Sequence, residues 1–411
     1  MTQPSEESVE DFRDRAGAWI DHHLPPWEAA QVETRELQHR LFEHGFAGIA
    51  FPRDFGGAGL TLDHQRAFYD EATRLDRQVP TTNRVSVGML APTILDHGSE
   101  AAKSQFLPPL LRGDTLWIQL LSEPQGGSDM AAAMTRLTRD GDVYVLNGAK
   151  MWSSGAHEAD FGLCLCRSNW DVAKHRGLSM IAVPLKGTPG MTIQRTRAAS
   201  GLVGDYCEEF FDDVVLPTEN MIGAEEDGWA VAQTLLLHER NTVGNIGFGY
   251  LGGRGSRAPQ RVYGGEPAPR SASAAAARGA LDAVGAAIVE DYIDSIVAPL
   301  TSARVMAGLR LGSHVGQWGS LTKLQSTVAA QRSVRTALAA WGADGVIWEG
   351  DHVRTDNVGT TWIESRGGTI AGGTNEMQRN IISERLLGLP REPAPDRDLP
   401  FNEVLRQARR R

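Results

Sequence analysis

The first part of the chain carries its apolar residues every three or four positions, as on one face of a helix. The first such set comprises Phe12, Ala16, Trp19 and Ile20. The spacing resumes after the Pro25-Pro26 break and continues to about residue 115, with one Gly-rich loop, FPRDFGGAGL (51–60), between the helices. We therefore predict a helical domain over residues 1–115.

From residue 116 the pattern changes to the two-residue alternation of strands. Val143 and Val145 share one face after an Asp-Gly turn, and the segment FGLCLC (161–166) alternates similarly. Short apolar runs of this kind continue to about residue 225. The sequence predicts a small β-barrel or sandwich domain over residues 116–225.

Helical spacing returns after the segment EEDG (225–228). Two apolar stripes are Trp229, Ala232, Leu236 and Val243, and then Leu321, Leu324, Val328, Leu338 and Trp341. We predict a helical domain over residues 226–395, followed by a tail at 396–411. Residues 249–279 are expected to be a mobile loop, because Gly, Pro, Ser, Ala and Arg bury too little apolar surface to fold alone. The fold class is α+β with several domains.

Composition narrows the class of protein. The 411 residues are 41% hydrophobic and 22% charged, which is typical of a folded chain with two or three domains. A formal charge of -10 argues against nucleic acid as the main ligand. Three cysteines fit neither a disulfide framework nor a four-ligand zinc site, and no run approaches the length of a membrane span. We expect a cytoplasmic protein without a structural metal.

Two segments of the predicted β domain suit a ligand that is both anionic and planar. SEPQGGSD (122–129) has small residues that let backbone amides approach an anion. NGAKMWSSGA (147–156) offers the indole of Trp152 to cover a ring and a hydroxyl, at Ser153 or Ser154, to bond a ring nitrogen. Taken alone, each segment equally describes an ordinary turn or a core tryptophan beside a polar turn.

A third segment, AGGTNEMQRNIISERLLGLP (371–390), combines a Gly-rich loop with a helix capped by Thr374 or Asn375. The free amides of a helix N-terminus can bind an anion or a polarised carbonyl, although the same pattern describes any well-capped helix. The three segments together are unlikely to be independent accidents.

In their order and spacing these segments resemble the acyl-CoA dehydrogenase family over almost the whole chain. FPRDFGGAGL is similar to the family's early Pro-x-x-x-Gly-Gly loop, HGSEAAKSQFLPPLLRGDTLW (97–117) to its helix pair, SEPQGGSD to its TEPGAGSD segment, and GGTNEMQRNIISERLLGLP to its closing helix. The resemblance implies an N-terminal helical domain, a middle β-barrel domain and a C-terminal four-helix-bundle domain. It also implies FAD as the cofactor.

Carried over residue by residue, the resemblance places the flavin along residues 119–128, with Trp152 and Ser154 flanking the isoalloxazine and the Ser154 hydroxyl directed to flavin N5. Thr374 and Glu376 match positions that touch the ribityl or adenosine portion of FAD. The implied cofactor-binding residues are Gln119, Leu121, Ser122, Ser128, Trp152, Ser154, Thr374 and Glu376.

The implied chemistry needs a carboxylate base, because an α proton must be removed as a β hydride leaves. In much of the family this glutamate directly precedes the Gly-Thr of the closing loop, where this chain has Gly372. A subset resembling isovaleryl- and long-chain acyl-CoA dehydrogenases places it on the first long helix of the C-terminal domain. There LLHERN (236–241) supplies Glu239.

Glu239 also stands out from the residues alone, because it lies four positions after Leu235 and four before Val243 on a mainly apolar stripe. A carboxylate on such a face is paired, protonated or functional, and a salt bridge with Arg240 is the alternative interpretation. We expect burial to raise its pKa toward neutrality. The expected catalytic groups are Glu239 and the Gly372 amide, which would bond the thioester oxygen. The expected substrate-binding residues are Ser128, Arg240 and Gly373.

The predicted activity is α,β-dehydrogenation of an acyl thioester in lipid metabolism, with electrons passing to an electron-transfer flavoprotein or a similar acceptor. The chain lacks the Arg-x-x-Phe-Gly motif that contacts the FAD adenine in many members, and its LTKLQ segment (321–325) is similar to a bacterial branch with bulky substrates and mixed subunits. We expect a homotetramer or homodimer, with a heteromer as the alternative. Desulfination, oxygenation and a non-catalytic subunit of a heterotetramer remain alternative functions.

Overall fold

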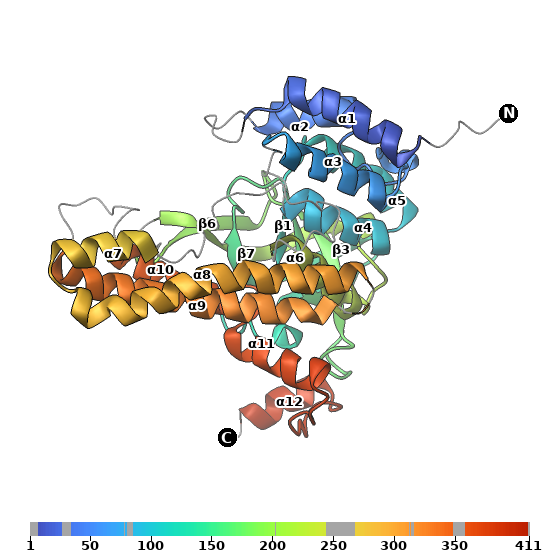
Figure 1. Ribbon diagram of the computed structural model, residues 1–411. Helices are drawn as coiled ribbons and strands as arrows, with labels where there is room; N and C mark the ends of the chain where they lie inside the picture. Colours follow the sequence, from blue (N-terminus) through green and yellow to red (C-terminus); the bar gives the residue numbers. More distant parts are fainter. Residues whose placement is uncertain are drawn as a thin grey trace. The chain divides into compact units, whose positions relative to one another are not determined.

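A computed structural model describes residues 7–26, 34–77, 79, 85–201, 203–243, 268–311, 313, 316–347 and 358–409 (Figure 1). The chain divides into two compact units. Unit 1 comprises Met1–Thr196, Asp205–Arg257 and Pro393–Arg411, and unit 2 comprises Arg197–Gly204 and Ala258–Glu392. Each unit is described by itself.

Unit 1 begins with the predicted helices. They are α1 (Val9–His23), α2 (Thr34–Glu43), α3 (Leu62–Arg74), α4 (Ala91–His97) and α5 (Glu100–Arg112), and a π-helical turn, η2 (Ser86–Leu90), leads into α4. Serine side chains cap two of them: Ser8 Oγ accepts from the amide of Asp11 at 3.1 Å, and Ser99 Oγ accepts from the amide of Ala102 at 3.1 Å. The expected apolar face of α1 is buried. These caps and faces confirm the helical beginning of the chain.

The strands follow as predicted. They are β1 (Trp117–Leu120), β2 (Arg136–Asp140), β3 (Val143–Ser154), β4 (Phe161–Arg167), β5 (Leu178–Pro184), β6 (Met191–Arg197) and β7 (Val203–Pro217). They form one curled sheet in the order β1-β4-β2-β3-β7-β6, with β5 paired to β4. Gly141 and Asp142 join β2 to β3 as a two-residue hairpin loop, and Gly141, the first of the two, takes a positive φ of 60°.

Strand β4 differs from the expected alternation, because nearly all of its residues are buried. Leu163 and Leu165 belong to the core shared with the helices, whereas Cys164 and Cys166 belong to the core inside the sheet. A strand that lies between two apolar cores has no solvent face, so its sequence reads as a continuous apolar run. Cys164, Cys166 and Cys207 are all buried, and none of them forms a disulfide.

After the sheet, α6 (Gly228–Val243) packs against η2, α4 and β5 through buried side chains that include Val231, Ala232 and Leu235. The short helix α12 (Phe401–Ala408) brings Phe401 under the guanidinium of Arg167, 3.9 Å from the ring centroid. The helix that carries the candidate base therefore rests on the sheet core.

Unit 2 consists of α7 (Ala268–Ala277), α8 (Leu281–Arg310), α9 (Gly319–Trp341), α10 (Val358–Ile370) and α11 (Asn375–Ile381). α8 packs on α9, α10 on α9, and α7 on both α8 and α9, which gives the expected bundle (Figure 1). The fold class is thus confirmed.

Two expectations for unit 2 were wrong in detail. The expected mobile loop 249–279 is helical over Ala268–Ala277, because alanine is the best helix former and Ala275 finds a buried place against the bundle; residues 249–267 lie outside the described residues. The buried face of α9 includes Val334, Ala337 and Ala340 rather than the predicted stripe, whose Val328 is 37% exposed. Small residues on α9 allow its neighbours to approach closely.

Candidate active site

The SEPQGGSD loop folds back on itself and onto β3. Glu123 and Gly126 exchange backbone hydrogen bonds of 3.0 and 2.9 Å, which closes a tight turn. The amide of Met151 donates to the carbonyl of Ser122 at 2.9 Å. The first two sequence motifs therefore meet through Ser122 and Met151, which are 29 positions apart, one residue before Trp152.

Trp152 is turned outward by an irregular backbone. Its φ is 66°, and the register of β3 with β7 shifts between Met151 and Ser153, so Trp152 forms a bulge. Its side chain is 55% exposed and makes an edge-to-face contact with Tyr206, with ring centroids 6.0 Å apart. The Ser154 hydroxyl is also exposed. Left-handed φ in a bulky residue costs about 1–2 kcal/mol, so the surrounding contacts must hold the indole in this position.

A buried ion pair lies beneath this surface. Lys150 Nζ is 2.7 Å from Glu123 Oε1 and also donates to the carbonyl of Leu121 at 3.1 Å, and both charged side chains are almost fully buried. The amides of Met134 and Thr135 donate to the Glu123 carboxylate at 2.6 and 3.0 Å. Burial pushes the pKa of Glu123 upward, but Lys150 and these hydrogen bonds outweigh it, so its pKa is lowered. The pair ties the loop to β3.

Arg167 fixes the segment that follows the loop. Its buried guanidinium donates to the carbonyl oxygens of Ala131 at 2.6 Å, Ala133 at 2.9 Å and Lys174 at 3.1 Å. Burial lowers the pKa of Arg167 to about 10, which leaves it charged at neutral pH. A charged group that bonds several carbonyls holds the backbone in one conformation.

Glu239 and Gln119 meet in unit 1. Gln119 Nε2 donates to Glu239 Oε2 at 3.4 Å, and Gln119 Oε1, which is buried, has no partner among the described residues. Both side chains are half-buried. Glu239 therefore lies beside the strand that leads directly into the SEPQGGSD loop.

Contacts between α4 and α6 fix the direction of Glu239. His97 Nε2 lies 2.8 Å from Thr234 Oγ1, and His238 Nε2 lies 3.2 Å from Asp96 Oδ2. Because both contacts lie within five residues of Glu239, they limit the rotation of this part of α6.

The turn between α10 and α11 holds Gly372 and Gly373, whose φ values are 65° and 84°. Gln378 Nε2 donates to their carbonyl oxygens at 3.0 and 3.1 Å. Lys323 Nζ donates to the Gly373 carbonyl at 2.7 Å and to Asn375 Oδ1 at 3.2 Å, and burial lowers the pKa of Lys323 to about 8. Three hydrogen bonds from side chains therefore hold the carbonyl groups of Gly372 and Gly373 in place.

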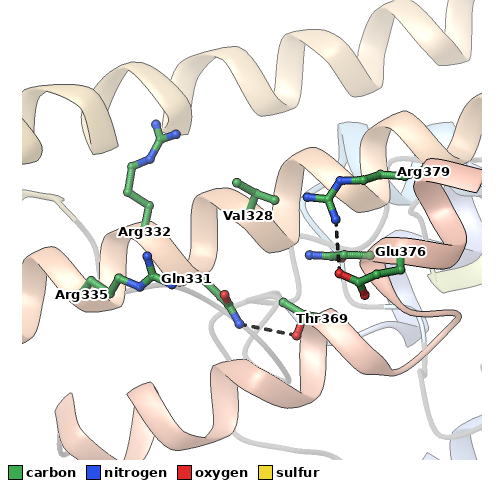
Figure 2. Close-up of a pocket in the computed structure, with 8 residues that line it drawn as sticks. Val328, Gln331, Arg332, Arg335, Thr369, Glu376 and Arg379 are labelled. Atoms are coloured by element: carbon green, nitrogen blue, oxygen red, sulfur yellow. Dashed lines mark hydrogen bonds and ion pairs between the residues drawn. The ribbon is translucent and has the colours of Figure 1, made fainter. Parts of the chain in front are cut away.

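A pocket of about 370 Å³ opens beside this turn (Figure 2). It is lined by Val328, Gln331, Arg332, Arg335, Thr369, Asn375, Glu376 and Arg379. Arg332 bonds Asp294 at 2.8 Å and Arg379 bonds Glu376 at 3.3 Å, whereas no carboxylate among the described residues pairs with Arg335. With three guanidinium groups and one carboxylate in its wall, the pocket suits an anion.

The predicted site residues fall into two sets. Unit 1 contains Gln119, Leu121, Ser122, Ser128, Trp152, Ser154 and Glu239, and the α10–α11 turn of unit 2 contains Gly372, Gly373, Thr374 and Glu376. The Leu121 side chain is buried, so it offers its backbone. Thr374 caps α11 by accepting from the amide of Met377 at 3.1 Å. The side chain of Arg240 lies outside the described residues.

Sequence reasoning missed the charged supports of the site, namely the buried Glu123, Lys150, Arg167 and Glu209 and the half-buried Lys323. The available signal was a charged residue inside a strand or helix that otherwise reads as apolar, as with Lys150 in β3. Such residues are rare in cores unless they are paired or functional. Among the described residues, no group of three or more His, Cys, Asp or Glu side chains is arranged to hold a metal ion.

Comparison with known proteins identifies the family. Residues 6–114, 119–214 and 271–387 match the N-terminal, middle and C-terminal domains of acyl-CoA dehydrogenase. The acyl-CoA dehydrogenase IpdE1 of Mycobacterium tuberculosis is 31% identical over 407 residues, which cover 94% of this chain and 99% of that protein. The chain belongs to the acyl-CoA dehydrogenase family. Its enzyme class, an FAD-dependent oxidoreductase of lipid metabolism, is the one expected from the sequence.

Solved structures of the family agree with this assignment. A structure titled Tcur3481-Tcur3483 steroid ACAD has a TM-score of 0.67 and 25% identity, and covers 95% of this chain and 100% of its own. The ChsE4-ChsE5 complex from Mycobacterium tuberculosis has a TM-score of 0.63 and 25% identity, with the same coverage. Among the described residues, no helix is long and apolar enough to cross a membrane.

The residues of this acyl-CoA dehydrogenase fit FAD, the cofactor of the family. The half-exposed indole of Trp152 and the exposed Ser154 hydroxyl offer a face and a hydrogen bond to a planar heterocycle. The SEPQGGSD loop is held close to that face by Lys150 and by the Met151 amide. A binding site whose backbone is held by such contacts loses little conformational entropy when its ligand binds.

Proposed function

We propose that this acyl-CoA dehydrogenase desaturates an acyl-CoA thioester between its α and β carbons, with Glu239 as the base. The observation that carries this proposal is the contact of Glu239 with Gln119, since it sets a half-buried carboxylate beside the strand and loop expected to hold the flavin. The position of the commoner family base is filled by Gly372, which has no side chain to take a proton.

In this proposal Glu239 removes the α proton, and Gln119 holds the carboxylate in its direction of attack. Bound FAD supplies the hydride acceptor, at flavin N5, for the hydrogen that leaves the β carbon. The α carbon becomes acidic enough only if charge on the thioester oxygen is stabilised, which we assign to the amide of Gly372. The hydrogen bonds from Gln378 and Lys323 to the carbonyls of this turn support that role, because they hold the backbone of the turn in place.

We further propose that Trp152 covers the isoalloxazine while Ser154 bonds its reactive edge, and that residues 119–128 lie along the rest of the flavin, with Ser128 near the pyrophosphate or the thioester ligand. Thr374, Glu376 and the arginines of the unit 2 pocket would bind the polar ribityl, diphosphate or adenosine portion. Three guanidinium groups in that pocket support an anionic occupant. Arg240 and Gly373 complete the proposed substrate contacts.

The proposed substrate is a bulky acyl-CoA with a ring system. This proposal rests on the similarity to a structure titled as a steroid acyl-CoA dehydrogenase, which covers 95% of this chain. An electron-transfer flavoprotein or a similar acceptor would reoxidise the enzyme. We place the protein in the cytoplasm, without a nucleic acid partner.

The test is anaerobic bleaching of the flavin by short, branched, aromatic and steroid-like acyl-CoA thioesters. We expect the wild-type protein to bleach with ring-bearing substrates, and Glu239→Gln to keep its yellow flavin but bleach about 10³-fold more slowly, within the usual range for loss of a general base. Glu219→Gln changes an exposed carboxylate of the same unit and should behave as wild type. Undiminished bleaching by Glu239→Gln would contradict the role of Glu239.

Product mass decides between the reaction types. Loss of two hydrogens supports desaturation, whereas a gain of oxygen or a loss of sulfite would establish oxygenation or desulfination instead. A protein that holds flavin only after a sister subunit is added, and turns over no thioester alone, would be a non-catalytic subunit. The contact between Glu239 and Gln119 argues against that outcome, because a subunit without chemistry needs no oriented carboxylate.

A further inference from the structure

Besides Glu123, unit 1 buries a second carboxyl group close to Trp152, and this one is not part of a described ion pair. Glu209 on β7 is fully buried, and Ser153 Oγ donates to its Oε2 at 2.9 Å. Its Oε1 has no hydrogen-bond partner among the described residues. Lys150 faces Glu209 in the register of β3 with β7, but the described ion pair and hydrogen bonds of Lys150 go to Glu123 and to the Leu121 carbonyl. Glu209 is thus a buried carboxyl group with one hydrogen bond.

Glu209 shares its face of β7 with the core inside the sheet. Its neighbours on that face, Cys207 and Phe211, are buried members of this core. An ionised carboxylate in apolar surroundings with an unsatisfied oxygen is strongly disfavoured, so the neutral acid is the form that fits.

The surroundings of Glu209 bring its pKa near neutral pH. Burial raises the pKa of Glu209 to about 7; the Ser153 hydrogen bond and the Lys150 ammonium oppose this rise, and Glu208 adds to it. Its other titratable neighbours among the described residues include the thiols of Cys164 and Cys207, and burial raises the pKa of both above its usual value. The imidazole of His157 lies next to this group, with Nδ1 3.5 Å from Cys207 Sγ.

The hydrogen bond from Ser153 to Glu209 crosses the Trp152 bulge. Ser153 follows the bulge on β3, whereas Glu209 lies opposite Lys150, which precedes it. The bond therefore ties the two ends of the bulge to one point on β7. On the upstream side, the Met151 amide is held by the Ser122 carbonyl at 2.9 Å. Removal of the Ser153 bond would leave the downstream side of the bulge held only by the backbone pairing of Ser153 and Ser154 with β7.

We propose that Glu209 is a positioning residue which, in its neutral form and through Ser153, holds the Trp152 bulge and thereby sets the positions of Trp152 and Ser154. Loss of its proton makes the carboxylate a better acceptor for Ser153 but leaves a charge with an unpartnered Oε1 in the core; the carboxylate must then move toward water, which loosens the bulge. The role of Trp152 and Ser154 toward a flavin rests on the proposed function; the control of the bulge by Glu209 does not.

Amide hydrogen exchange of the purified full chain tests the bulge directly. Exchange of peptides covering residues 148–156 is followed by mass spectrometry between about pH 5.5 and about pH 8.5, with rates corrected for the intrinsic effect of pH. We expect the protection of these amides in the wild-type protein to fall about tenfold through a single step near the pKa of Glu209. Peptides from α1, far from the sheet in sequence, serve as an internal reference.

Three variants decide the assignment. Glu209→Gln, which keeps an acceptor for Ser153 without a charge, should remain protected at every pH. Ser153→Ala should lower protection even at low pH. Glu208→Gln is the matched control on the adjacent residue of β7 and should keep the step. A step that persists in Glu209→Gln, or protection in Ser153→Ala equal to that of wild type, would overturn the proposal. If Glu209→Gln does not fold, the Ser153→Ala result decides.

A second measurement links the bulge to the cofactor. In protein loaded with FAD, the visible absorption of the flavin should shift with pH through the same step in the wild type and stay constant in Glu209→Gln. A protein that binds no flavin but retains the exchange step would contradict the proposed function and leave Glu209 as a controlling residue. A constant flavin spectrum in loaded wild-type protein would show that the bulge does not set the flavin environment.

Discussion

Gln119 Nε2 donates to Glu239 Oε2 across 3.4 Å, joining β1 to α6 over a separation of 120 residues. The contact sets the Glu239 carboxylate beside β1, and the oxygen of the Gln119 amide, Oε1, has no partner among the described residues. A hydrogen bond donated by the Gln119 amide to the Glu239 carboxylate stabilises the ionised carboxylate, which is the form that acts as a base.

Gln119→Leu should therefore raise the pKa that governs kcat and lower kcat at neutral pH by about tenfold, the expected effect of losing roughly 1.4 kcal/mol from a hydrogen bond to a charged group. KM for the thioester should change less than kcat. The full dependence of kcat on pH is the deciding measurement. Gln233→Leu, an exposed position on the same helix, is the control and should leave the profile unchanged. An unshifted profile in Gln119→Leu would remove Gln119 from the mechanism.

Lys150→Met should be strongly destabilising. It leaves the Glu123 carboxylate buried without its cation, which typically costs about 3–5 kcal/mol. The double variant Lys150→Met/Glu123→Gln should recover part of this loss, because no isolated charge remains. Urea unfolding measures both. Lys186→Met breaks an exposed pair with Asp160 and should change stability by no more than about 1 kcal/mol. Equal losses of stability in Lys150→Met and Lys186→Met would show that the burial of an ion pair does not determine its contribution to stability.

The raised pKa of Glu209 predicts that its contribution to the free energy of unfolding decreases as the pH rises. Its pKa rises from 4.5 in the unfolded chain to about 7 in the fold, so the folded state retains a proton that the unfolded state releases. The contribution of this group to stability is complete below pH 4.5 and is lost as the pH rises through 7. A displacement of this size corresponds to about 3 kcal/mol.

The measurable quantity is the difference between Glu209→Gln and wild type, because other groups titrate in both proteins. The variant should gain up to about 3 kcal/mol on the wild type between pH 5 and pH 8, as seen by denaturant unfolding at each pH. Glu208→Gln should run parallel to the wild type over the same range. A difference that does not change with pH would mean that Glu209 does not titrate in the folded protein.

The arginine pocket of unit 2 predicts an effect on cofactor affinity. Arg335→Gln removes the guanidinium that no described carboxylate neutralises, and should weaken FAD binding by about tenfold if it contacts a phosphate. Equilibrium dialysis of FAD gives the affinity, and riboflavin, which lacks phosphate, should bind the variant and wild type equally. Arg304→Gln on α8, outside the pocket lining, is the control. Unchanged FAD affinity would assign the pocket to another anion.

The sequence was sufficient for the order of elements because each apolar period extends over many residues. α1 illustrates this: its four predicted apolar residues are all buried. The motifs also predicted that Ser122 and Trp152 belong to one site, and the hydrogen bond from the Met151 amide to the Ser122 carbonyl joins their segments. Neither inference required knowledge of which strands are neighbours.

The residues that support the site could not be predicted without knowing which strands and helices are neighbours. Glu209 lies in the segment EEFFDD, and alternation alone places it on one face with Phe211 without saying that this face is the core. Only the pairing of β7 with β3 brings it against Ser153, and only the crossing of β1 and α6 brings Gln119 to Glu239. The helix α7 was missed for a different reason, because a Gly- and Pro-rich neighbourhood masked a run of alanines.

The exposed face of α8 predicts how the protein assembles. Six apolar side chains that are 40–62% exposed follow one another along one face of this helix, at alternating steps of three residues and one; they are Val289, Tyr292, Ile293, Ile296, Val297 and Leu300. A continuous apolar stripe of this length on a long helix is the pattern of a helix-packing interface between subunits. We expect a second copy of the chain to cover it, giving a homodimer or homotetramer.

The double variant Ile293→Glu/Ile296→Glu should shift the protein to a smaller species in size-exclusion chromatography with light scattering, because each buried isoleucine contributes about 1.5–3 kcal/mol and a buried glutamate reverses that gain. Ser295→Glu adds negative charge on the same helix but off the stripe, and should keep the oligomer intact. The wild-type chain could instead be monomeric until a homologous subunit is added. If Ile293→Glu/Ile296→Glu then blocks that association, the stripe is the interface of a heteromer, as in the structure titled ChsE4-ChsE5 complex. An oligomer of unchanged mass in the double variant would mean that the copies meet through another surface.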